Sequence, residues 1–118
     1  MTELDAEDTK LLTLARGAMG RTGGAAGAAV RDTDGRTYAA GEVGLQELRL
    51  TALQAAIAAA ISSGAEGFEA AVVVGGQFKD AGVPAVREVS ASARIVFADR
   101  SGSVFDIVDD AAAEVSGG

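Results

Sequence analysis

The side chains behind most protein metal and nucleophile chemistry are missing from this chain. Its 118 residues include no cysteine and no histidine. Protein zinc sites are built from Cys sulfur, His nitrogen and carboxylate oxygen, usually with at least one of the first two. Cys nucleophiles, His general bases and triads oriented by His are excluded as well. We therefore expect no bound transition metal and no cofactor.

Hydroxyls, carboxylates and two lysines are the groups left for chemistry. Thr51, Ser90 or Ser92 could serve as a nucleophile only beside a base, and neither Lys10 nor Lys79 lies in a recognisable motif. We expect Thr51 to cap or line a buried helix instead.

Carboxylates are frequent near the carboxyl end of the chain and could hold a divalent cation through oxygen ligands. They are Asp99, Asp106, Asp109, Asp110 and Glu114. No loop with ligand spacing is present, and carboxylates near a helix start are common for electrostatic reasons alone. The electrostatic explanation is therefore the simpler one.

The charge and hydropathy of the chain exclude two classes of partner. The net charge is −7 and the two lysines are accompanied only by scattered arginines, which argues against nucleic acid as a partner. No apolar run approaches the roughly 20 residues that a membrane helix needs. The acidic start lacks the basic and apolar regions of a signal peptide, so we expect a cytoplasmic protein.

The apolar pattern predicts the elements that must position these groups. They are a helix at 5–19, a hairpin with strands at 25–31 and 36–43, a helix at 47–63, a strand at 70–74, one or two helical turns at 83–90, strands at 94–98 and 103–107, and a closing helix at 108–115. This order predicts one domain over residues 1–118, a three-layer α/β/α domain with a mixed β-sheet.

The predicted hairpin carries a resemblance to a known family. It reads Gly27-Ala28-Ala29-Val30, then Asp34-Gly35-Arg36, Tyr38 and Gly41. This resembles the cytidine deaminase family, whose first hairpin reads V-G-A-A-hydrophobic, D-G, G. The similarity continues through the central helix to Gly64 and into the strand at 71–74. It implies a cytidine deaminase-like fold.

The resemblance also implies where the family's catalytic residues would stand. In the family the central helix opens with Cys-Ala-Glu-Arg, whose cysteine binds zinc and whose glutamate moves protons. Counting back from Gly64 places Thr51 at the cysteine and Leu53 at the glutamate. The second motif, Pro-Cys-Gly-x-Cys-Arg-Gln, has its candidate at Pro84 and contains neither cysteine. The resemblance thus implies a degenerate member without zinc ligands or proton shuttle.

The leading hypothesis is a catalytically inactive domain that acts through protein contacts or as a structural subunit. The alternative is a binding module that keeps the old pocket for a small, nucleoside-like molecule. The candidate pocket residues are Val43, Leu45, Gln46, Thr51 and Gln54. A metal-free hydrolytic enzyme is a third possibility. A cleft lined by threonine and glutamine would favour binding, whereas a pocket closed by Val43, Leu45 and Leu53 would favour the leading hypothesis.

The predicted helix at 47–63 is apolar on nearly every side, and such a helix must be covered on all sides. The apolar residues on its different sides are Leu48, Leu50, Leu53, Ala56, Ile57, Ala60 and Ile61. The family that the chain resembles packs the central helices of neighbouring subunits together. We therefore expect a homo-oligomer, a dimer or tetramer, with a monomer covered by the closing helix as the competing possibility.

Overall fold

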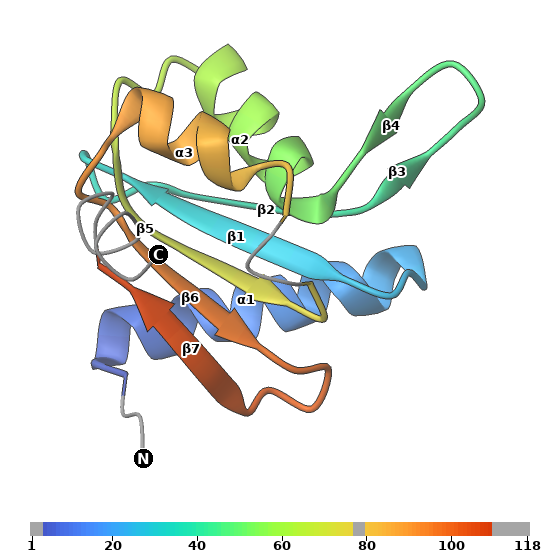
Figure 1. Cartoon of the computed structure of the whole chain (residues 1–118), viewed down its shortest axis with the longest axis horizontal. Helices are drawn as coiled ribbons and strands as arrows, with labels where there is room; N and C mark the ends of the chain where they lie inside the picture. The colour runs from blue at the N-terminus through green and yellow to red at the C-terminus, as the bar shows by residue number, and fades with distance from the viewer. Residues whose placement is uncertain (1–3, 77–79, 110–118) are drawn as a thin grey trace.

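A mixed five-stranded sheet lies between one helix on one face and two on the other (Figure 1). The computed structural model describes residues 4–76 and 80–109. The elements are α1 (Ala6–Thr22), β1 (Gly27–Asp32), β2 (Thr37–Gly41), β3 (Val43–Gly44), β4 (Arg49–Leu50), α2 (Ala52–Ser62), β5 (Phe68–Val74), α3 (Val83–Val89), β6 (Arg94–Ala98) and β7 (Val104–Val108). The predicted fold class, a three-layer α/β domain with a mixed sheet, is confirmed.

The sheet has the strand order β2-β1-β5-β6-β7. The β5–β6 pair is parallel, and the other neighbouring pairs are antiparallel. β5 is buried on both faces, as its continuous apolar sequence predicts. Val73 faces the core beneath α2 and α3, whereas Val72 and Val74 face α1. The sheet therefore separates two apolar cores, each closed by its own helix layer.

The predicted start of the central helix at residue 47 is wrong. The helix begins at Ala52, and Arg49–Leu50 form β4, which pairs with β3. The reason is a capping box: Thr51 Oγ1 accepts from the amide of Gln54 at 3.1 Å, and Gln54 Oε1 accepts from the amide of Thr51 at 2.9 Å. The predicted capping role of Thr51 is therefore confirmed.

The last part of the chain was predicted only partly. The strand predicted at 103–107 is β7, one residue further on. The closing helix was predicted to begin at Val108, but Val108 is the last residue of β7. Residues 110–115 of the predicted helix lie outside the described part of the chain. Lys79, Asp110 and Glu114 also lie outside it.

Candidate functional site

The starts of α2 and α3 meet at a single carboxylate. Asp80 Oδ1 accepts a hydrogen bond from Thr51 Oγ1 at 2.7 Å and another from the backbone amide of Gly82 at 2.7 Å. Thr51 is the N-cap of α2, and Gly82 is the N-cap of α3. Asp80 therefore ties together the starts of two helices, although it lies 29 residues from Thr51 in sequence. We call Thr51, Leu53, Asp80 and Gly82 the helix junction.

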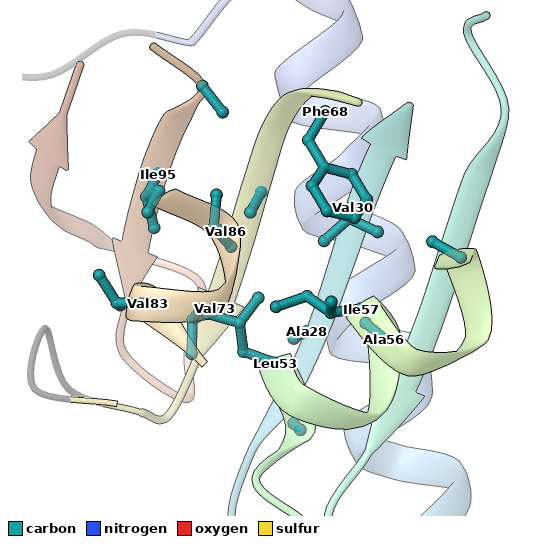
Figure 2. Close-up of a cluster of buried hydrophobic side chains, with 14 of the residues drawn as sticks. Ala28, Val30, Leu53, Ala56, Ile57, Phe68, Val73, Val83, Val86 and Ile95 are labelled. Atoms are coloured by element: carbon teal, nitrogen blue, oxygen red, sulfur yellow. The ribbon is translucent and has the colours of Figure 1, made fainter. Parts of the chain in front are cut away.

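Leu53 fills the inner side of the helix junction. Its side chain is fully buried in the core cluster that includes Val73, Val83 and Val86 (Figure 2). A Cβ built on Gly82 would lie 2.7 Å from Leu53 Cγ and 2.9 Å from Leu53 Cβ. The backbone at the start of α3 thus lies directly against Leu53, and glycine permits that approach.

A shallow depression of about 350 Å³ lies on the outer side of the same helix start. Its lining residues are Glu42, Val43, Gly44, Arg49, Leu50, Thr51 and Gln54. The structure thus brings together three of the five predicted pocket residues, Val43, Thr51 and Gln54. Leu45 and Gln46 are not among the lining residues, because they lie in the loop between β3 and β4.

The Thr51 hydroxyl and the side-chain oxygen of Gln54, two polar groups of this depression, are engaged within the protein. The Thr51 hydroxyl donates to Asp80 and accepts from the Gln54 amide, and Gln54 Oε1 accepts from the Thr51 amide. The lining of the depression includes the threonine and glutamine that the binding module predicts, whereas Leu53 is buried in the core and is not among the lining residues. Leu45, which the leading hypothesis expected to help close the pocket, is 60% exposed and does not line the depression.

A second polar region lies at the amino ends of β5 and β6, where α1 begins. Asp8 is buried, with a side chain 3% exposed, and pairs with Arg31 NH2 at 3.2 Å and with Arg94 NH1 at 3.5 Å. Arg31 also pairs with Glu69 at 2.8 Å, and Arg94 with Asp109 at 3.0 Å. We call these five residues the ion network. They line most of a depression of about 410 Å³.

The ion network favours the charged form of Arg31. Burial lowers the pKa of the Arg31 guanidinium, but hydrogen bonds and charge from Glu69 and Asp8 outweigh burial and raise that pKa above its ordinary value. Two guanidiniums thus compensate the buried carboxylate of Asp8. This arrangement is suited to fastening α1 to the sheet.

Of the carboxylates considered as a cation site, the three in the described part of the chain, Asp99, Asp106 and Asp109, do not form a metal-binding group. Asp99 accepts hydrogen bonds from Ser101 and Ser103 within its own turn, and its pKa is lowered, first by the Ser101 hydroxyl. Asp109 belongs to the ion network. Within residues 4–76 and 80–109, no three His, Cys, Asp or Glu side chains gather closely enough to hold a metal ion. In the same ranges no helix is long and apolar enough to cross a membrane.

Comparison with known proteins agrees with this architecture. A family model described as cytidine deaminase-like matches residues 4–102. The chain belongs to the cytidine deaminase-like family. The 1.6 Å crystal structure of a cytidine deaminase from Burkholderia pseudomallei is similar, with a TM-score of 0.65 over 92% of this chain and 93% of that chain. The two sequences are 22% identical, so this likeness shows the fold alone. No curated protein matches the chain.

Sequence reasoning about this cytidine deaminase-like domain missed Asp80 and the ion network. Asp80 carried no signal, because its partner Thr51 is distant in sequence. Asp8 lies in the first turn of α1, where the helix dipole alone favours a carboxylate, so its position gave no sign of a buried ion pair. The positions of Arg31 and Arg94 gave a usable signal: each is a charged residue beside small and apolar residues in a predicted strand, where a charge needs a partner.

Proposed function

We propose that this cytidine deaminase-like domain does not deaminate nucleosides and acts through protein contacts or as a structural subunit. The resemblance described above assigns the zinc ligands and the proton shuttle to the starts of the two helices that meet at the helix junction. One observation carries the proposal: Leu53, at the shuttle position, is fully buried against the backbone of Gly82. A leucine side chain has no proton to give or accept, and here it supports the core.

The donor atoms at the helix junction do not suit zinc. A zinc site takes sulfur, nitrogen or carboxylate ligands, almost always four of them in a structural site. The junction offers one hydroxyl and one carboxylate, and the Asp80 oxygen nearest to Thr51 already accepts two hydrogen bonds. The hydrogen-bonded link through Asp80 holds the two helix starts together without a metal. We therefore derive no metal-dependent step for this chain.

The proposal is tested by assaying cytidine and deoxycytidine with the purified full-length protein. The ultraviolet change from cytidine to uridine and the release of ammonia are followed beside an active cytidine deaminase. We expect no turnover above the buffer and no stoichiometric zinc by elemental analysis. Turnover that follows the protein through every column and falls in the Asp80→Ala variant would overturn the proposal. Stoichiometric zinc in the purified protein would also overturn it.

A second candidate function is the binding of a small, nucleoside-like molecule. The observation that favours it is the 350 Å³ depression, which Thr51 and Gln54 line beside Val43. Nuclear magnetic resonance titration of the labelled protein with cytidine or uridine tests it. Saturable shifts confined to the amides around this depression, and lost in Gln54→Ala, would support binding. Shifts that are absent or spread over the whole domain would reject it.

A further inference from the structure

The depression of about 350 Å³ beside the start of α2 contains two charged side chains of opposite sign. Glu42 lies between β2 and β3, and Arg49 opens β4, so the two charges come from the two sides of one hairpin (Figure 1). Both side chains line the depression, but among the residues that the structure describes no ion pair joins them. A molecule that carries both charges could therefore bind between them.

Gly44 leaves the space between these charges open. It pairs with Arg49 across the hairpin and follows Glu42 by two residues. An extended chain places residues two apart on the same side, and diagonal neighbours across two strands lie about 7–8 Å apart. A Cβ built on Gly44 would have no heavy atom of the described chain within 4 Å. We call Glu42, Gly44 and Arg49 the two-charge site.

Each charged side chain of the two-charge site is oriented by one contact with the backbone. Glu42 Oε1 accepts from the amide of Ala25 at 3.1 Å, and Arg49 Nε donates to the carbonyl of Leu45 at 3.2 Å. Within residues 4–76 and 80–109, the second carboxylate oxygen of Glu42 and the two terminal nitrogens of Arg49 have no partner. Groups that are already oriented lose less conformational freedom when they bind a ligand.

The rest of the lining narrows the class of ligand. The Thr51 hydroxyl and the side-chain oxygen of Gln54 are engaged within the protein, so the free carboxylate oxygen and guanidinium nitrogens are the strongest polar groups left for a ligand. Val43 and Leu50 pair with each other and add apolar surface to the depression. Small-molecule sites have volumes of about 300–1,000 Å³, so this depression suits a small ligand.

We propose that the two-charge site binds a free α-amino acid with a branched apolar side chain. The ligand carboxylate accepts from the guanidinium of Arg49, whose planar group matches a carboxylate, and the ligand ammonium donates to Glu42. The apolar side chain of the ligand lies against Val43 and Leu50. The proposal goes beyond the proposed function, because it assigns a ligand to the domain and does not depend on the lack of deamination.

The first test titrates L-leucine into the ¹⁵N-labelled full-length protein and follows its amides by nuclear magnetic resonance. Two analogues each lack one charge: 3-methylbutylamine has no carboxylate, and 4-methylpentanoate has no ammonium. We expect L-leucine to cause saturable shifts at residues 42–44 and 49–51, and each analogue to bind about tenfold more weakly. An analogue that binds as tightly as L-leucine would overturn the proposal.

The second test removes one protein charge at a time. Glu42→Gln keeps an oxygen acceptor for the amide of Ala25, and both it and Arg49→Gln should weaken L-leucine about tenfold. Glu42→Gln should leave the affinity for 4-methylpentanoate unchanged, because that analogue has no ammonium to pair with Glu42. Glu66→Gln and Arg21→Gln make the same charge changes at exposed positions outside the depression and should leave L-leucine binding unchanged.

The third test fills the two-charge site and keeps both charges. Gly44 is not among the glycines with positive φ, and valine suits a strand, so Gly44→Val is compatible with the backbone of β3. Its side chain should occupy the open space and abolish the saturable shifts. Circular dichroism checks that this variant and the charge variants are folded.

The outcomes separate this proposal from the proposed function. The absence of saturable shifts with L-leucine at millimolar concentrations overturns the amino-acid site and leaves the cytidine and zinc assays unaffected. Shifts that persist unchanged in Glu42→Gln, Arg49→Gln and Gly44→Val overturn it as well. Cytidine, which is uncharged, is titrated in parallel, and if it binds as tightly as L-leucine the charges do not select the ligand and the proposal is overturned. Cytidine turnover would overturn the proposed function without changing the amino-acid titration.

Discussion

Asp80 at the helix junction and Asp8 in the ion network each join a helix start to the rest of the domain, by different means. Asp80 is half-buried and accepts from a hydroxyl and a backbone amide, both neutral. Asp8 is buried and faces two guanidiniums. Asp80 keeps contact with water and is held by neutral donors, whereas the buried carboxylate of Asp8 is compensated by charge. We expect packing around Leu53 to make the larger contribution to stability at the helix junction, and charge to make the larger contribution in the ion network.

The largest effect is expected from Leu53→Ala at the helix junction. Removing a fully buried leucine leaves a cavity, and such changes cost about 2–5 kcal/mol of unfolding free energy. Urea denaturation followed by circular dichroism measures the loss, which should not depend on salt. Ile61→Ala is the matched control on the exposed side of the same helix and should cost about 0.5 kcal/mol or less. Equal costs for the two variants would show that packing does not dominate the junction.

Asp8→Ala should have the next largest effect, because it leaves two arginines without their shared partner. Removing one member of a buried ion pair costs about 3–5 kcal/mol, and the remaining pairs of Arg31 and Arg94 should keep the loss near the lower end. Asp109→Ala, at the 66% exposed rim of the same network, should cost about 1 kcal/mol or less. The same urea experiment compares them. If the two variants lose equal stability, the burial of Asp8 does not make its ion pairs more important for stability than the exposed pair of Asp109.

Asp80→Ala should destabilise the junction less than either change above. It removes two hydrogen bonds to a half-buried carboxylate, for which we expect a loss of about 1–3 kcal/mol. Asp80→Asn keeps an oxygen acceptor and should recover part of that loss. Hydrogen exchange at the Gly82 amide gives a local readout. If exchange there is as slow in Asp80→Ala as in the parent protein, the amide does not depend on this carboxylate.

The smallest effect concerns acid sensitivity, for which Asp32 offers a third carboxylate, held by neutral donors. Burial raises its pKa, but hydrogen bonds from the amides of Arg36 and Asp34 and from the Tyr38 hydroxyl outweigh burial and hold the pKa below its ordinary value of 3.8. A lowered pKa means that its contribution to stability is complete above pH 3.8 and is lost as the pH falls through the folded-state pKa.

Asp32→Asn should therefore flatten the fall in unfolding free energy below about pH 3.8, where an acidic group with a lowered pKa acts. Denaturation at a series of acidic pH values measures this slope. Asp34→Asn, at the exposed next turn position, is the control and should leave the slope unchanged. Parallel curves for Asp32→Asn and the parent protein would contradict the expected role of Asp32.

Local sequence patterns predicted the elements whose signals lie within a few residues. The strand at 70–74 was predicted because its apolar run fits a strand buried on both faces, and the capping role of Thr51 follows from a hydroxyl at a helix start. The start of α2 was not predicted, because Leu48 and Leu50 suit a helix and an alternating strand equally well. The pairing of Leu50 with Val43 decided between them.

The sequence by itself determined that no cysteine thiolate and no histidine imidazole can act in this protein, because neither residue occurs in the chain, whatever its fold. It also determined the family, through the hairpin around Gly27 and Gly41. The tertiary structure alone decided which carboxylates are buried and what holds them. Asp80 meets Thr51 across 29 residues, and Asp8 meets Arg94 from the far end of the chain. Such partners are selected by the packing of layers, since a local pattern carries no information about which distant donors a fold will bring near.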